Sequence, residues 1–183
     1  MTNPGVPSEP SHKVGPGKPA PVMMHVLVVC TANICRSPTG EGIVRHLIEE
    51  AGLKRDVLVD SAGTKAGTGT PPDIRSRLLA EGGGYSLAGI SSRPIAPRDY
   101  KEFDLILAMD DKHRRDMRMD CPLDHTDKIR LFMDYTPGMV GTSVPDPYYG
   151  EDKDFALAFE LIGKGAKGLV AAIQDQKPYL DYR

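Results

Sequence analysis

Cysteine is scarce in this chain, and long hydrophobic runs are absent. Three cysteines among 183 residues are too few for a disulfide framework, so the composition favours a reducing compartment, the cytoplasm. Because no apolar stretch is long enough to cross a bilayer, we expect no membrane partner. The net charge of −2 argues against general binding to nucleic acid, and we expect no nucleic-acid partner.

Large apolar side chains are almost missing from residues 1–21, which are rich in proline, glycine, serine and lysine. Such a segment cannot bury enough surface to order itself, so we predict a flexible N-terminal tail over 1–21. It also lacks the continuous apolar core of a secretory signal. The remaining residues, 22–183, have a suitable length for a single domain with a full core.

Strand-like and helix-like patterns alternate along this domain. Short aliphatic runs predict buried strands at 26–29, 57–64, 103–110 and 128–133. Helical spacing of apolar residues predicts helices over 38–51, from 73 to the glycines at 82–84, over 111–120 and over 155–173. Because helices separate the strands, the fold class is α/β: a doubly wound parallel four-stranded sheet flanked by helices, with ligands at the carboxyl ends of the strands.

Two groups of charged side chains are expected to lie in solvent. In the first helix, the side opposite the apolar positions carries Glu41, Arg45, Glu49 and Glu50. In the helix over 111–120, His113 and its neighbours Arg114 and Arg115 form either a basic patch or an ordinary solvated face. The solvated face is the simpler interpretation.

The histidines and cysteines do not combine into a metal site. Cys30 and Cys35 have four residues between them, but no second pair and no spaced histidines complete a four-ligand set. Residues 163–168 match the dinucleotide fingerprint G-x-G-x-x-G, but no strand precedes them and helical periodicity continues through them. We attribute these glycines to close helix packing, and we expect neither a metal nor a cofactor.

The most informative stretch runs from His25 to Pro38 and reads HVLVVCTANICRSP. It combines a buried strand that ends at Cys30, a short polar loop, and helix-start chemistry at Ser37 and Pro38. We expect backbone N–H groups of residues 31–36 to converge on one point in front of the positive end of the helix dipole. Arg36 adds a planar cation that binds two oxyanion oxygens at once. The loop therefore predicts a site for a tetrahedral anion.

Cys30 lies at the edge of this predicted anion site. A helix N-terminus and an arginine stabilise a thiolate, so Cys30 is a candidate nucleophile in a C-x5-R pattern with Arg36. The alternative is that Cys30 is inert filling at the end of a core strand. The position between a buried strand and a capped helix favours the nucleophile, with Asn33 and Ser37 holding the loop and donating to the sulfur.

The segment Val-Cys-Thr-Ala-Asn-Ile-Cys-Arg-Ser-Pro resembles the signature loop of the low-molecular-weight protein tyrosine phosphatases, although Ala32 stands where that family usually has glycine. The resemblance implies that residues 22–183 are a catalytic domain of this kind, with the phosphatase loop at the end of the first strand. It makes Cys30 the nucleophile and Arg36 the phosphate-binding arginine. The loop residues that it assigns to phosphate binding are Thr31, Ala32, Asn33, Ile34, Cys35 and Arg36.

Two further segments bear on the loop. The sequence Asp-Ser-Ala-Gly-Thr at 60–64 resembles the family segment whose serine supports the loop asparagine, so Ser61 is a candidate support for Asn33; its other interpretation is a simple turn residue. The loop at 65–72 lacks the aromatic residue that forms a cleft wall in relatives. Many relatives have a histidine where Ile90 stands, so one hydrogen bond to the loop is expected to be missing.

The region 136–150 lacks periodicity and predicts a long loop, a common place for functional residues. Within it, Pro145 and Pro147 fix the backbone on both sides of Asp146. By itself this is a turn with surface tyrosines, but it resembles the Asp-Pro general-acid loop of the same family. The resemblance makes Asp146 the general acid and base, and we expect Tyr148 and Tyr149 to line the cleft and stack on an aryl phosphate.

These assignments predict hydrolysis of phosphotyrosine proteins or small aryl phosphates through a cysteinyl-phosphate intermediate, without a metal. Cys35 also resembles the family's redox partner, which captures an oxidised nucleophile as a reversible disulfide; the alternative is that it fills the back wall of the loop. 

Three other functions are open. Arsenate reductases share this loop, but they need further cysteines late in the chain, where only Cys121 is available. Protein-arginine phosphatases tend to have threonine at the position of Ile34. A non-catalytic oxyanion-binding module gains support from Ala32, because alanine strains the loop if its φ is positive.

Overall fold

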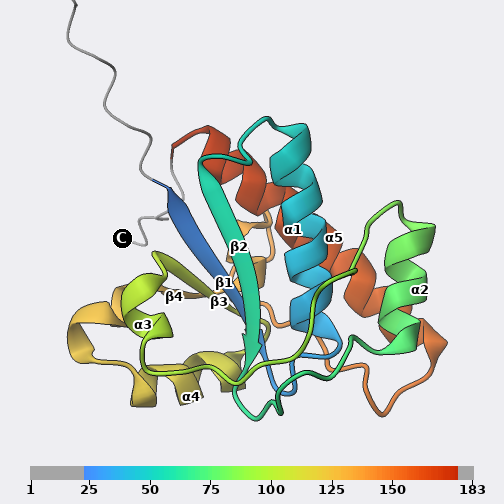
Figure 1. The fold of residues 1–183 in the computed structure, drawn as a ribbon, viewed down its shortest axis with the longest axis horizontal. Coiled ribbons are helices and arrows are strands. Elements are labelled where there is room, and N and C mark those ends of the chain that lie inside the picture. Colours follow the sequence, from blue (N-terminus) through green and yellow to red (C-terminus); the bar gives the residue numbers. More distant parts are fainter. Residues whose placement is uncertain (1–22, 177–183) are drawn as a thin grey trace, which may run out of the picture.

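A computed structural model describes residues 23–176, so the predicted tail over 1–21 lies outside the described residues. The centre of the fold is a parallel sheet with the strand order β2-β1-β3-β4 (Figure 1). Its strands are β1 (Met24–Cys30), β2 (Val57–Gly63), β3 (Leu105–Ala108) and β4 (Ile129–Leu131). The predicted fold class, a doubly wound parallel four-stranded α/β sheet, is confirmed.

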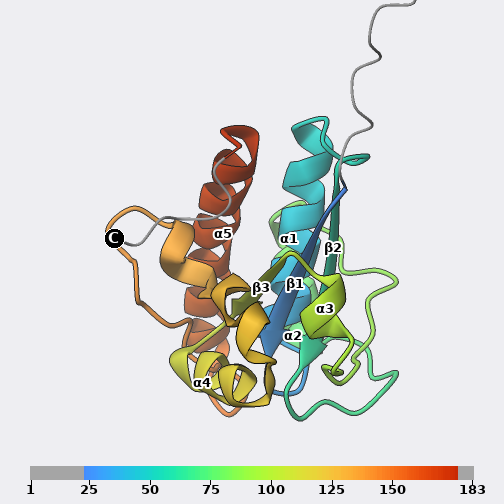
Figure 2. The same ribbon diagram turned by 90° about the vertical axis from the view of Figure 1, so that its left-hand side faces the viewer.

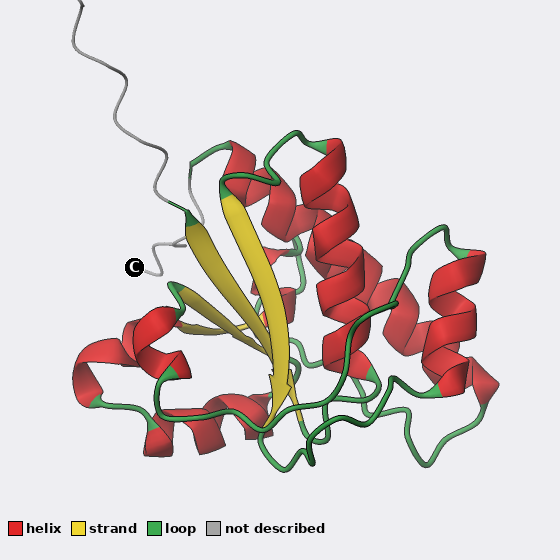
Figure 3. Cartoon of the chain, viewed as in Figure 1, coloured by secondary structure: helices red, strands yellow, loops and turns green. Residues whose placement is uncertain are grey.

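Helices cover both faces of this sheet (Figure 3). One face packs against α1 (Arg36–Glu50) and α5 (Asp152–Gln174), and α2 (Ile74–Gly82) lies against those two helices. The other face packs against α3 (Asp99–Glu102) and α4 (Asp111–Asp120), which are nearest the viewer in Figure 2. None of the helices within residues 23–176 is long and apolar enough to cross a membrane.

The sheet divides the hydrophobic core into two layers because successive side chains of a strand point to opposite faces. In β1, Val26 and Val28 pack with the residues of α1 and α5, whereas Leu27 and Val29 pack with those of α3 and α4. All four side chains are fully buried. This central strand therefore places its last residue, Cys30, firmly at the carboxyl edge of the sheet.

The third and fourth strands are shorter than the sequence predicts. β3 covers 105–108 rather than 103–110, because Phe103 ends α3 and Asp110 caps the N-terminus of α4. β4 covers 129–131 rather than 128–133, and a 3-10 helix over Phe132–Tyr135 follows it directly. That turn is held by the Asp134 carboxylate, which accepts a hydrogen bond of 3.0 Å from the Leu131 N–H. A second 3-10 helix, Leu123–Lys128, was not predicted.

The glycines at 163–168 lie inside α5, as expected, and two of them allow close packing. A Cβ atom on Gly168 would overlap the carbonyl of Tyr135, and one on Gly165 would meet the ring of Phe132 at 2.6 Å. The motif is therefore a packing surface of a continuous helix against the segment after β4, and it provides no dinucleotide-binding turn.

Candidate active site

A cleft of about 210 Å³ opens at the carboxyl end of β1, where α1 begins. It brings the loop after β1 together with a segment that lies more than a hundred residues later in the chain. The lining residues are Cys30, Thr31, Ala32, Ile34, Cys35, Arg36, Asp146, Tyr148 and Tyr149. The three predicted support residues, Asn33, Ser37 and Ser61, are buried behind this lining.

The loop presents a thiol and a row of free backbone donors. Cys30 is 3% exposed, and its Sγ lies 3.0 Å from the Ser37 hydroxyl oxygen. The backbone N–H groups of residues 31–36 donate to no other group among residues 23–176. The first turn of α1 has no acidic side chain, and Cys35 makes no side-chain cap. These free donors and the helix dipole together favour an anion in front of the sulfur.

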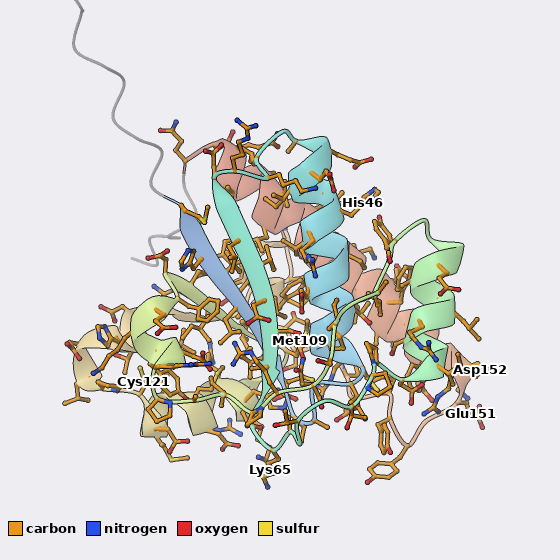
Figure 4. All side chains as sticks on the ribbon, viewed as in Figure 1. His46, Lys65, Met109, Cys121, Glu151 and Asp152 are labelled. Carbon is orange, nitrogen blue, oxygen red and sulfur yellow. The ribbon has the colours of Figure 1, made fainter. Side chains whose placement is uncertain are left out.

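Arg36 is buried and held from two sides. Its Nη1 donates to Asp110 Oδ2 at 2.8 Å and to the Val144 carbonyl at 3.0 Å, and its Nη2 donates to Asp146 Oδ2 at 2.6 Å. The Val144 N–H in turn donates to the Met109 carbonyl at 2.8 Å. Met109 lies near the N-terminal end of α1 (Figure 4). The guanidinium therefore joins the loop after β1 to the segment that carries Asp146.

The carboxyl group of Asp110 stays ionised beside this arginine. Burial by itself would raise the pKa of Asp110, but hydrogen bonds from His113 and from Arg36 outweigh burial and hold the pKa well below its usual range. Asp110 thus fixes the orientation of the guanidinium at any pH at which the protein would work.

Asn33 fills the inside of the loop. It adopts a left-handed conformation with a φ of 55°, and its Nδ2 donates to the hydroxyls of Ser37 and Ser61, both at 2.8 Å. Its Oδ1 accepts a hydrogen bond from the Arg93 N–H at 3.0 Å. Ala32 does not have positive φ; in the described part of the chain Asn33 and Gln176 are the non-glycine residues that do. The strain considered for Ala32 therefore does not arise.

Glu41 extends this support, and the prediction that it lies on a solvated face was wrong. It is 5% exposed, and Ser61 Oγ donates to its Oε2 at 2.6 Å. Burial raises the pKa of Glu41. Because Glu41 follows Ser37 by one helical turn, it shares the face of α1 that points to the loop.

Ile90 stands where many relatives have a histidine. Its apolar side chain packs against Ala80 and Leu87.

His113 is also buried, at 1% exposure, so the prediction of a solvated face was wrong for this residue too. Its Nε2 lies 2.8 Å from Thr31 Oγ1, and its Nδ1 lies 2.9 Å from Asp110 Oδ1. Its neighbours Arg114 and Arg115 both form ion pairs with Asp111. Within this charged run His113 points inward, because residues three or four positions apart in a helix lie on the same side.

Comparison with known proteins agrees with this geometry. Residues 25–179 match the family described as low molecular weight phosphotyrosine protein phosphatase. The chain belongs to this family. It is 37% identical to a low molecular weight protein-tyrosine-phosphatase of Streptomyces coelicolor, over 82% of this chain and 94% of the relative. It is 36% identical to a human low molecular weight phosphotyrosine protein phosphatase, over 74% and 86%. The crystal structure of YfkJ from Bacillus subtilis is 36% identical and superposes with a TM-score of 0.79, covering 85% of this chain and 97% of that one.

In this low molecular weight phosphatase, the segment after β2 lies directly against the loop after β1. The N–H groups of Thr64 and Lys65 donate to the carbonyls of Cys30 and Thr31 at 2.9 and 2.8 Å. A Cβ atom on Gly63 would meet backbone atoms of Thr31 and Asn33, so the close approach depends on glycine. Lys65 itself is exposed and points away from the protein (Figure 4).

Tyr148 and Tyr149 of the phosphatase lie at the rim of the cleft. Tyr148 is 41% exposed and Tyr149 97% exposed, and their rings are nearly perpendicular with centroids 4.9 Å apart. Arg75 anchors this segment: its Nη2 donates to the Tyr148 carbonyl at 3.3 Å and to Asp73 Oδ2 at 3.0 Å. Because the Asp73 N–H donates to the Ile34 carbonyl at 2.8 Å, Arg75 connects the two loops of the site. Arg75 was not predicted as a site residue from the sequence.

The other two cysteines of the phosphatase have different surroundings from Cys30. Burial, with a further contribution from the Asp73 carboxylate, raises the pKa of Cys35 to about 12, so this residue is a thiol at neutral pH. Cys121 follows the last residue of α4, at the opposite end of that helix from Asp110 (Figure 4). No group of three or more histidine, cysteine, aspartate or glutamate side chains among residues 23–176 is placed to hold a metal.

Proposed function

We propose that this phosphatase hydrolyses phosphotyrosine in proteins through a cysteinyl-phosphate intermediate. The observation that carries the proposal is that one cleft contains Cys30, Arg36 and Asp146 with a set of unused backbone donors. Those donors and the guanidinium match the three equatorial oxygens of a phosphoryl group in transfer. In-line displacement requires the thiol and the carboxyl group on opposite sides of that phosphoryl group, and both residues line this cleft.

In the first chemical step the Cys30 thiolate attacks phosphorus, and the bond from phosphorus to the tyrosine oxygen breaks. Asp146, in its protonated form, gives its proton to the departing oxygen, which contributes roughly 10² to 10⁴ in rate. In the second step ionised Asp146 takes a proton from water, the water oxygen bonds to phosphorus, and the thiolate leaves. The products are free tyrosine hydroxyl and inorganic phosphate.

The contact between Arg36 and Asp146 joins the phosphate-binding arginine to the general acid. Arg36 Nη2 donates to Asp146 Oδ2 at 2.6 Å. A phosphate dianion competes with the Asp146 carboxyl group for the same N–H groups, because the guanidinium fork binds two oxyanion oxygens at once.

Two features favour an aryl substrate over the related alternatives. Tyr148 and Tyr149 offer aromatic faces in the lining of the cleft, although residues 65–72 contain no aromatic side chain. Ile34 gives the cleft floor an apolar side chain where arginine phosphatases tend to have threonine. The relay of thiols that an arsenate reductase needs has no support, because Cys121 lies at the far end of α4.

Matched peptides that carry phosphotyrosine, phosphoarginine or phosphoserine at one position test this proposal. We expect kcat/KM for phosphotyrosine to exceed that for phosphoserine roughly a hundredfold, since a phenolate is the better leaving group and the ring contacts the rim. Phosphate release is the measurement, and p-nitrophenyl phosphate is the positive control. A preference for phosphoarginine would overturn the substrate assignment. Binding of inorganic phosphate without any turnover would identify a non-catalytic module.

We also propose that Cys35 protects the nucleophile against oxidation, in a reducing compartment such as the cytoplasm. Peroxide converts the Cys30 thiolate to a sulfenic acid, and the Cys35 sulfur then condenses with it, releasing water and forming a disulfide. The negative charge of Cys30 is one cause of the raised pKa of Cys35. Oxidation removes that charge, so it makes the Cys35 thiolate easier to form when it is needed.

For the protein treated with peroxide, we expect dithiothreitol to restore activity and mass spectrometry to find a Cys30–Cys35 linkage. In Cys35→Ser the same treatment should inactivate irreversibly, because nothing stops further oxidation of Cys30. Cys121→Ser is the matched control, and its recovery should equal that of the unmodified protein. Full recovery of Cys35→Ser would show that Cys35 only fills the back of the loop.

A further inference from the structure

A continuous set of contacts connects the two ends of the phosphate loop through a residue outside it. It begins at Thr31, directly after the nucleophile, and passes from Thr31 Oγ1 to His113 Nε2 at 2.8 Å. His113 Nδ1 lies 2.9 Å from Asp110 Oδ1, a close charge contact that does not have hydrogen-bond geometry. The set of contacts ends where Arg36 Nη1, at the other end of the loop, donates to Asp110 Oδ2 at 2.8 Å.

The imidazole of His113 is the middle of this connection and has little freedom. The residue is 1% exposed, so its ring nitrogens meet only groups inside the protein. The Asp110 carboxylate also accepts a hydrogen bond of 2.8 Å from the His113 backbone N–H, which caps α4. The backbone bond depends on no side chain at position 113. The beginning of the helix and the contact of the ring can therefore be separated by substitution.

Packing alone does not account for a histidine at this position. The side chain enters a layer in which Met117, one turn later in α4, is purely apolar and equally buried. A buried imidazole that filled space only would cost free energy unless it were paired. Both of its nitrogens instead face groups that belong to the phosphate site or hold its arginine. Thr31, in turn, lines the cleft beside Cys30.

We propose that His113 is a positioning residue, which sets the distance between the Thr31 end of the phosphate loop and the Arg36 guanidinium. It does so through the hydrogen bond between its Nε2 and the Thr31 hydroxyl, while its Nδ1 stays 2.9 Å from the Asp110 carboxylate. The cradle for the phosphate dianion then has a fixed width before substrate arrives, and no binding energy is lost in ordering it. This inference rests on the proposed function of the loop as a phosphate site.

The experiment compares four proteins: the unmodified chain, His113→Phe, Thr31→Val and the double variant. Phenylalanine keeps a ring without nitrogens, and valine replaces the threonine hydroxyl with a methyl group. We expect each single variant to weaken inhibition by inorganic phosphate roughly tenfold and to lower kcat/KM for p-nitrophenyl phosphate at least as much. The double variant should be no worse than His113→Phe alone, because that substitution already removes the link to Thr31. Thr31→Ser keeps the hydroxyl and should lose less than Thr31→Val.

Met117→Ala is the matched control, because it loosens the packing of α4 without touching the connection. It should lower the melting temperature but leave the inhibition constant of phosphate unchanged. Unchanged phosphate inhibition in Thr31→Val, or effects of the two single variants that multiply in the double variant, would overturn the role of His113. Thr31→Val decides the question alone if His113→Phe does not fold. Failure of the unmodified protein to bind phosphate would instead overturn the proposed function.

Discussion

Replacing Cys30 with serine is expected to abolish turnover, by about 10⁴-fold or more, while the protein still binds inorganic phosphate. The sulfur is the only atom of the site that can form the covalent intermediate, and a serine hydroxyl is not ionised at the end of β1. The donors that hold the anion, the backbone N–H groups of 31–36 and the Arg36 guanidinium, do not involve that sulfur. Initial rates with p-nitrophenyl phosphate and the thermal shift caused by phosphate give the two measurements.

The controls for this variant are a substitution at Cys121 and a second substitution at Cys30. Cys121→Ser changes a buried cysteine away from the cleft and should leave turnover at its original level. Cys30→Ala should lose as much activity as Cys30→Ser, since neither side chain supplies a nucleophile. Substantial turnover in Cys30→Ser would show that water attacks phosphorus directly, and the covalent route would be wrong.

The sequence was sufficient for the sheet and the phosphate loop because both are determined locally. β1 is a continuous aliphatic run, which is typical of a strand covered on both faces, and it ends at the residue where the loop begins. The loop carries its function in consecutive residues, so its chemistry can be inferred without knowing any distant contact. Asp146 needed the resemblance to a family, because a carboxyl between two prolines is otherwise an ordinary turn.

The residues that were missed act through contacts made only after folding. Glu41 was predicted to be exposed because it lies opposite the apolar positions of α1, and His113 because it lies in a charged stretch. Arg75 stabilises the segment of Asp146 through a carbonyl that belongs to a residue 73 positions later. No periodicity within a helix specifies such a partner. One usable signal was present: Glu41 and Ser37 are one turn apart on α1.

The strand ends were wrong for a different reason. Apolar residues continue beyond both β3 and β4, but Asp110 and Asp134 each end the extended backbone by accepting hydrogen bonds from main-chain N–H groups. Aspartate commonly competes for the backbone in this way. In β3 the interruption matters for the site, since it turns Asp110 toward Arg36.

Asp146→Asn is expected to lower kcat by roughly 10² to 10³ for phosphotyrosine, because the departing phenolate then leaves without a proton. The loss should be smaller for p-nitrophenyl phosphate, whose leaving group is stable as an anion, and larger for an alkyl phosphate. The measurement is kcat for a series of phosphomonoesters arranged by the acidity of the leaving alcohol. In the unmodified protein kcat should depend weakly on that acidity, and in the variant it should depend steeply.

The same variant separates acid catalysis from binding, because Asp146 competes with phosphate for Arg36. Asparagine can still accept a hydrogen bond from Arg36 Nη2 but lacks the charge that holds the present 2.6 Å contact. Inhibition by inorganic phosphate should therefore be equal or stronger in Asp146→Asn, although turnover falls. Equal loss of kcat for good and poor leaving groups would argue against an acid role. If phosphate binding also became weaker, Asp146 would instead shape the cleft. Loss of the Arg36 position would weaken both phosphate binding and turnover.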